Sequence, residues 1–124
     1  MKHVISTTNA YPPIGPYSQA IRANGFVFVS GQVPLDPSQQ LIAGGDIVSQ
    51  TRQVMDNISA VLSAAGSDLN KVVRSTVYLR DMADFAAMNE VYGKYFTSAP
   101  PARSTLQVGL IKDALVEVDV IALA

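Results

Sequence analysis

The chain has no cysteine and only one histidine, His3, which lies close to its start. The lack of cysteine excludes disulfides, thiolate nucleophiles, iron–sulfur clusters and cysteine-ligated zinc sites. A lone histidine in such a position is more often a solvated side chain than a catalyst or a metal ligand. Any chemistry must therefore come from Arg, Glu, Asp, Tyr, Ser, Thr, Asn and backbone groups.

The sequence also lacks an excess of charge of one sign and a long apolar run. Nine basic and ten acidic residues leave a formal net charge of -1, unlike the basic surface of a nucleic-acid-binding protein. No apolar stretch approaches the roughly 20 residues of a membrane-spanning helix. Residues 1–6 also lack the apolar core of a signal peptide. From these three absences together we expect a cytoplasmic protein that binds neither nucleic acid nor membranes.

The composition that is present suits one domain. The 124 residues, 48% of them hydrophobic, show no repeat and no linker, so residues 1–124 are expected to fold as a single unit. Three prolines and a glycine make residues 11–18 a stiff, irregular segment. Strands are predicted over 19–23 and 26–32, joined by Asn24-Gly25, a pair that favours a type I′ hairpin turn.

A loop over 34–45 and then a helix are expected next. Asp46 suits the N-cap of this helix, and Gly66 suits the position just beyond its last turn. Apolar residues recur between them at helical spacing, at Val54, Ile58, Val61, Leu62 and Ala65. This stripe predicts the buried face of the helix.

A strand over 72–79 and a second helix follow. Alternation places Val73, Val77 and Leu79 on one face of the strand and Arg74, Thr76 and Tyr78 on the other. Asp81 or Asp84 can cap the second helix. Its expected core stripe consists of Phe85, Met88, Tyr92, Tyr95 and Phe96.

Pro100-Pro101 ends this helical region, and two closing strands are predicted over about 103–108 and 115–123. The order of elements is β-β-β-α-β-α-β-β. It indicates an α+β sandwich in which two helices cover one face of a mostly antiparallel sheet.

Two strands are apolar on both of their faces, although two helices can cover only one face of the sheet. Residues 26–29 are Phe-Val-Phe-Val, and seven of the nine residues in 115–123 are apolar. Either the loops over 6–18 and 34–45 or another copy of the chain must cover the second face. We expect an oligomer, because an exposed face of this kind would exceed the apolar patch that a soluble monomer tolerates.

Arg103 is a candidate for binding a carboxylate. The prolines before it fix its backbone, and its planar guanidinium suits a bidentate carboxylate contact, although a surface ion pair would explain it equally well. Glu117 and Asp119 lie two residues apart in one strand and therefore share a face. They form either a solvated edge, the commoner case, or a polar site in which close packing raises the pKa of one carboxyl group.

Tyr17, Ser30, Gly31 and Asn89 are weaker candidates, because each of these residue types is also common in a core or a turn. The sequence holds no GxGxxG, Walker or GxSxG motif and no His and Asp residues at metal-ligand spacing.

Five segments together resemble the RidA/YjgF family in order and spacing. They are Ile14-Gly15-Pro16-Tyr17-Ser18-Gln19-Ala20, Ser30-Gly31-Gln32-Val33-Pro34-Leu35, Asn89-Glu90-Val91-Tyr92, Pro101-Ala102-Arg103-Ser104 and Val116-Glu117-Val118-Asp119-Val120-Ile121-Ala122. The resemblance implies a chorismate-mutase-like α+β fold and a homotrimer whose sheets close into a barrel, with active sites between subunits. It also implies hydrolysis of 2-aminoacrylate and 2-iminobutyrate, released by pyridoxal-phosphate-dependent dehydratases, to 2-keto acids and ammonia. This reaction needs neither a metal nor a cofactor, because the imine is already electrophilic.

The resemblance also implies roles for single residues. Arg103 would bind the substrate carboxylate, and Glu117 would orient water or transfer protons. The pocket would be lined by Tyr17, Ser30, Gly31, Asn89 and Thr105. Thr105 stands where many relatives have Cys, residues 108–113 lack the family's usual Arg and Pro and are one residue shorter, and Asp119 replaces a common Glu.

Two other functions remain open at this point. The resemblance also implies, as an alternative, a non-enzymatic regulator of the purine-regulator type or a chaperone-like protein, in which the same pocket would bind a small carboxylate. A ribonuclease or translation inhibitor fits less well, because the chain has no histidine pair and no patch of basic and aromatic residues for RNA.

Overall fold

A computed structural model describes residues 1–38 and 45–124, so that residues 39–44 of the expected 34–45 loop lie outside the described residues. The strands are β1 (His3–Ile5), β2 (Ala20–Ala23), β3 (Phe26–Gln32), β4 (Val72–Leu79), β5 (Ala102–Gln107) and β6 (Val116–Leu123). The helices are α1 (Ile47–Ala64) and α2 (Phe85–Gly93), with 3-10 turns η1 (Leu69–Lys71) and η2 (Met82–Asp84). This order confirms the predicted β-β-β-α-β-α-β-β arrangement. Its first strand, to which the sequence patterning assigned no residues, is β1.

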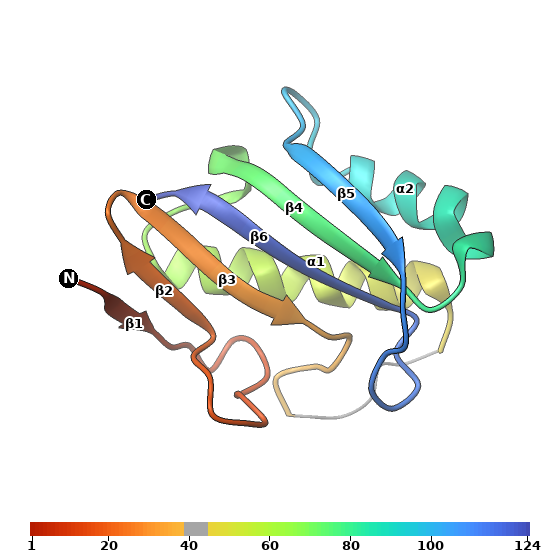
Figure 1. Cartoon of the computed structure of the whole chain (residues 1–124), viewed down its shortest axis with the longest axis horizontal. Coiled ribbons are helices and arrows are strands. Elements are labelled where there is room, and N and C mark those ends of the chain that lie inside the picture. Colours follow the sequence, from red (N-terminus) through yellow and green to blue (C-terminus); the bar gives the residue numbers. More distant parts are fainter. Residues whose placement is uncertain (39–44) are drawn as a thin grey trace.

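The strands form one sheet in the order β1-β2-β3-β6-β4-β5 (Figure 1). Neighbouring strands are antiparallel except β4 and β5, which run parallel. Both helices lie against one face of this sheet. None of the helices in the described ranges is long and apolar enough to span a bilayer.

The core lies between the helices and the sheet. Strand β6 shows how it is built: Val116, Val118 and Val120 are buried against the helices, whereas Glu117 and Asp119 between them point to the other face. The predicted stripe of α1 is confirmed, because all five of its residues are at most 2% exposed.

Local signals in the sequence define the ends of α1 and the first hairpin. The Asp46 carboxylate accepts a hydrogen bond from the Ser49 N–H at 2.8 Å, and Gly66 has a φ of +78°, as the residue after a helix often does. The backbone N–H of Ser67 then donates to the Leu62 carbonyl. Asn24 and Gly25 have φ values of +52° and +82°, as a type I′ turn requires.

The pattern was wrong for Val73, which is 42% exposed instead of sharing the buried face of Val77 and Leu79. The pairing of β4 with β6 shifts between Val72 and Arg74, and this irregularity breaks the alternation on which the prediction depended. The stripe of α2 was also wrong in part. Phe85 is 38% exposed, and the helix ends at Gly93, before Tyr95 and Phe96. Asp81 caps η2, which leads directly into α2, whereas the Asp84 side chain makes no capping bond.

The sheet face away from the helices is called the open face here. Four large apolar side chains on it, those of Val4, Phe28, Leu106 and Leu123, are 44–62% exposed. Their neighbours in sequence, such as Val27, Val29 and Ala122, are buried on the helix side. In a single chain, therefore, the described loop residues leave these four side chains open to solvent.

Candidate active site

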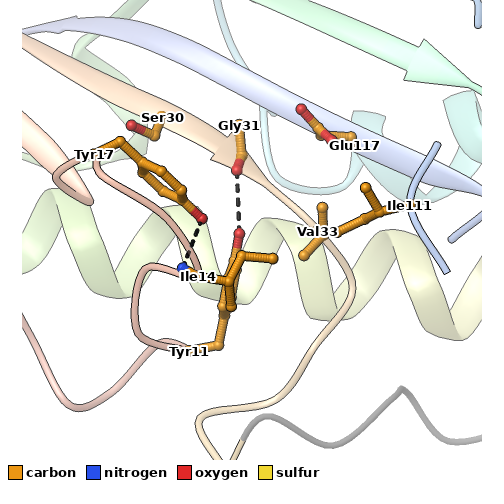
Figure 2. Close-up of a pocket in the computed structure, with 8 residues that line it drawn as sticks. All are labelled: Tyr11, Ile14, Tyr17, Ser30, Gly31, Val33, Ile111 and Glu117. Carbon is orange, nitrogen blue, oxygen red and sulfur yellow. Dashed lines mark hydrogen bonds between the residues drawn. The ribbon is translucent and has the colours of Figure 1, made fainter.

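A pocket of about 330 Å³ lies where the stiff N-terminal segment meets the ends of β3 and β6 (Figure 2). Its lining is made of Tyr11, Ile14, Tyr17, Ser30, Gly31, Val33, Ile111 and Glu117. Four residues expected at a site from the sequence, Tyr17, Ser30, Gly31 and Glu117, thus come together here.

The buried side chain of Gln19 holds the N-terminal segment in place. Its amide N–H groups donate to the carbonyls of Thr7 and Tyr11, and its side-chain oxygen accepts from the Thr7 N–H at 2.7 Å. The Tyr17 hydroxyl in turn accepts a hydrogen bond from the Ile14 N–H at 3.2 Å. These bonds satisfy backbone N–H and carbonyl groups that pair with no strand, and they place Tyr11 and Tyr17 at the pocket.

Ser30 and Gly31 lie where the pairing of β3 with β6 shifts, between Val29 and Gln32. The Ser30 hydroxyl donates to the Ser18 carbonyl at 2.6 Å and so joins β3 to the N-terminal segment. A Cβ atom at Gly31 would overlap the Glu117 carboxylate. Only glycine therefore leaves room for the carboxylate in this place.

Glu117 is half-buried, and burial raises the pKa of its carboxyl group above the ordinary value. The negative charge of Asp119, on the same face of β6, adds to the rise in this pKa. Asp119 itself accepts a hydrogen bond from the Tyr78 hydroxyl at 2.8 Å. One carboxyl group of the predicted pair, that of Glu117, therefore has a raised pKa.

Arg103 and Thr105 lie on β5 and Asn89 lies on α2, outside the lining of this pocket. The Arg103 guanidinium carbon lies 4.9 Å from the centre of the Tyr92 ring and 5.7 Å from that of Phe85. Both distances suit cation–π contact, which orients the guanidinium. Among the described residues the Asn89 Oδ1 atom is buried and has no hydrogen-bond partner. Most buried polar atoms in folded proteins do have such a partner.

Within one chain Arg103 and Glu117 face opposite sides of the sheet. Arg103 pairs with Ser75, whose hydroxyl is bonded to that of Tyr92 on α2 at 2.6 Å, so it faces the helices. Glu117 faces the other way, between buried Val116 and Val118. A single chain therefore does not bring Arg103, Asn89 and Thr105 to the pocket that contains Glu117.

Four lining residues of the pocket were not singled out from the sequence: Tyr11, Ile14, Val33 and Ile111. Ile14 and Val33 belong to the quoted motifs, so the signal for them was present. Tyr11 begins the proline-rich segment, and Ile111 lies in the loop that departs from the family pattern. No group of three His, Asp or Glu side chains in the described ranges is arranged to hold a metal ion.

Comparison with known proteins decides the family. A family model described as endoribonuclease L-PSP matches residues 7–124. The chain belongs to this family. The earlier resemblance to RidA/YjgF proteins is thereby confirmed, since these are members of the same family.

Relatives in the L-PSP family cover nearly the whole chain. A RutC family protein of Pyrococcus horikoshii is 57% identical over 123 residues, which are 98% of each chain. The 2-iminobutanoate/2-iminopropanoate deaminase of Mus musculus is 44% identical over 98% of this chain and 91% of its own. The crystal structure of the Rid-family protein YyfA from Yersinia pestis superposes over all of both chains with a TM-score of 0.96 at 46% identity.

Proposed function

We propose that the protein hydrolyses reactive 2-imino and 2-enamine acids, such as 2-iminobutanoate and 2-aminoacrylate, to 2-oxo acids and ammonia. The observation that carries the proposal is the Glu117 carboxyl group, half-buried in the pocket with its pKa raised. The name of the mouse relative supports the same chemistry at the level of the family. The balance is one imine and one water consumed, one 2-oxo acid and one ammonia formed.

Glu117 serves as the group that orients water and carries its proton. An imine carbon is already electrophilic, so attack by water needs orientation and a proton relay but no metal or redox cofactor. A carboxylate with a raised pKa accepts the water proton more readily than an ordinary glutamate and returns it to the nitrogen as ammonia leaves. Tyr17, Ser30 and Gly31 shape the space in which this occurs.

Arg103 serves as the carboxylate anchor, with Asn89 and Thr105 beside it. Its planar guanidinium offers two parallel N–H donors to a carboxylate, and its contacts with Tyr92 and Phe85 keep the fork oriented. Because Arg103 and Glu117 face opposite sides of one sheet, the complete site needs Arg103 from a neighbouring copy of the chain.

The assembly that we propose is a cytoplasmic homotrimer. The apolar open face supports it, since Phe28 and Leu106 are each about 45% exposed in one chain. Covering such side chains removes apolar surface from water, which favours association. A closed cyclic trimer would give three equivalent sites, each with Glu117 from one subunit and Arg103 from the next.

A coupled assay tests the proposal. A pyridoxal-phosphate-dependent dehydratase releases 2-aminoacrylate from serine or 2-iminobutanoate from threonine, and formation of the 2-oxo acid is followed with and without the purified protein. We expect faster formation of the oxo acid when the protein is present. A rate equal to that in buffer alone, with the dehydratase unchanged, would contradict the proposal.

A further inference from the structure

Tyr11 is a pocket residue to which no role has yet been given. The residue is only 3% exposed and packs in a small apolar cluster with Val33 and Leu35. The same residue lines the pocket, next to Tyr17 and across from Glu117 (Figure 2). The ring is therefore held firmly, while its hydroxyl group lies at the wall of the space that receives the ligand.

The Tyr11 hydroxyl makes a weak bond. It donates to the Gly31 carbonyl over 3.3 Å, whereas O–H donors usually lie 2.7–2.8 Å from an oxygen acceptor. A bond of this length is weak, so the Gly31 carbonyl alone does not fix the donor, although the Tyr17 hydroxyl and the Val33 backbone also contact the phenol oxygen. Burial of the ring and the neighbouring Tyr17 hydroxyl raise the pKa of Tyr11, which keeps the phenol protonated and therefore a donor.

The position of Tyr11 indicates which atom of a ligand it would reach. Gly31 lies between Tyr11 and Glu117, with its carbonyl bonded to the first and its Cα against the carboxylate of the second. The negative charge of Glu117 repels a ligand carboxylate, which belongs near Arg103. The part of the ligand beside Gly31 is therefore C2, the carbon to which water adds, together with the substituent bonded to C2.

We propose that Tyr11 is a further substrate-binding residue, whose phenol donates a hydrogen bond to the oxygen on C2 of the bound acid. This oxygen is present in the 2-oxo acid product and in the hydrated intermediate that precedes it. The inference rests on the proposed function, because it takes the ligand to be a 2-oxo or 2-imino acid.

The test compares two ligands that differ only at C2. 2-Oxobutanoate carries an oxygen there, and butanoate does not. Tyr11→Phe keeps the ring that packs on Val33 and Leu35 and removes only the hydroxyl group. We expect the Kd for 2-oxobutanoate, measured by titration calorimetry on the assembled protein, to rise about three- to tenfold, as loss of one neutral hydrogen bond does. The Kd for butanoate should change less than about twofold on the same basis.

Tyr95→Phe is the matched control. The Tyr95 hydroxyl bonds the Asp56 carboxylate at 3.1 Å, outside the pocket, so its removal should alter neither Kd. Thermal unfolding of each variant, recorded first, sets a working temperature at which all of them are folded.

The outcomes separate this inference from the proposed function. If Tyr11 only supports the backbone at Gly31, both ligands weaken equally or neither does, and either result overturns the inference while the coupled assay still reports deaminase activity. If the wild-type protein fails in the coupled assay but the selective loss for 2-oxobutanoate is seen, the role of Tyr11 stands and the deaminase proposal falls. If wild-type protein does not bind 2-oxobutanoate, the role of Tyr11 is overturned as well.

Discussion

Gly31 and Glu117 are in such close contact that any side chain at position 31 would occupy the space of the carboxylate. The contact joins β3 to β6 where the register between these strands shifts. The Glu117 carboxylate can therefore take this orientation only because residue 31, on the neighbouring strand, has no Cβ atom.

Gly31→Ala is expected to turn the Glu117 carboxylate away without unfolding the chain, because the overlapping atoms lie toward the end of a flexible side chain. Misplacing a catalytic group by about 1 Å can reduce turnover about 100-fold, and we expect a fall in kcat of this order in the coupled assay. The thermal midpoint should change little. Gly109→Ala is the control, because a Cβ there meets no atom within 4 Å. Equal activity of the two variants would show that the Glu117 orientation does not matter.

Local patterns predicted much of this fold, since each depends on a few neighbours in sequence. The helical spacing of Val54 and Ile58 sufficed to find the buried face of α1, and Asn24-Gly25 sufficed to find the first turn. Val73 was assigned to the wrong face because a shift in strand pairing leaves no trace in an alternating pattern.

The site was harder to predict, because it depends on which strands become neighbours. Motifs identified Tyr17 and Glu117 as candidate site residues, and the structure places both in one pocket. Nothing in the sequence showed that Arg103 faces the helices while Glu117 faces away from them. Tyr11 was not predicted as a pocket residue, because a tyrosine before two prolines has no sequence spacing that links it to β3.

Glu117→Gln is expected to lower kcat on the order of 100-fold or more while changing ligand affinity little, since it removes a proton acceptor and keeps the shape. In the wild-type protein kcat/KM should fall on the acid side as Glu117 becomes protonated, at a higher pH than for an ordinary glutamate. Rate profiles against pH for both proteins measure this. A variant with unchanged turnover would instead favour a sensor that only binds a small carboxylate.

Glu117→Gln is expected to increase the stability of the fold, although it lowers turnover. Because the pKa of Glu117 is higher in the folded chain than in the unfolded chain, the folded state retains a proton that the unfolded state has lost between the two values. Stability therefore falls as the pH rises through that interval. Glu117→Gln resembles the protonated group, so it should raise the thermal midpoint at neutral pH and not at a pH below both values. Equal midpoints at neutral pH would show that the assembled protein does not keep this pKa raised, as expected if Arg103 of a neighbouring copy lies close enough to Glu117 to offset the effect of burial.

Phe28→Glu tests whether the open face joins subunits. Phe28 is 44% exposed in one chain, and a charge in its place would be buried without a partner if a neighbouring copy covers it. We expect a smaller particle in light scattering and loss of turnover, since the proposed site needs two chains. Met82→Glu is the control, because Met82 is 41% exposed on η2 instead of on the sheet. An assembly of unchanged mass would show that the open face does not join the subunits.

Mixing two inactive variants tests whether Arg103 and Glu117 of different subunits form one site. Arg103→Ala removes the carboxylate anchor and Glu117→Gln removes the proton acceptor, so each variant alone should be nearly inactive. After unfolding and refolding of an equal mixture, about three quarters of cyclic trimers contain both variants, and each of these has one intact site of three. Activity should therefore return to about a quarter of the wild-type value. A tag on one variant, used to copurify the other, confirms that mixed assemblies form. If they form and no activity returns, both residues must act from the same chain, and the site that we propose between subunits is wrong.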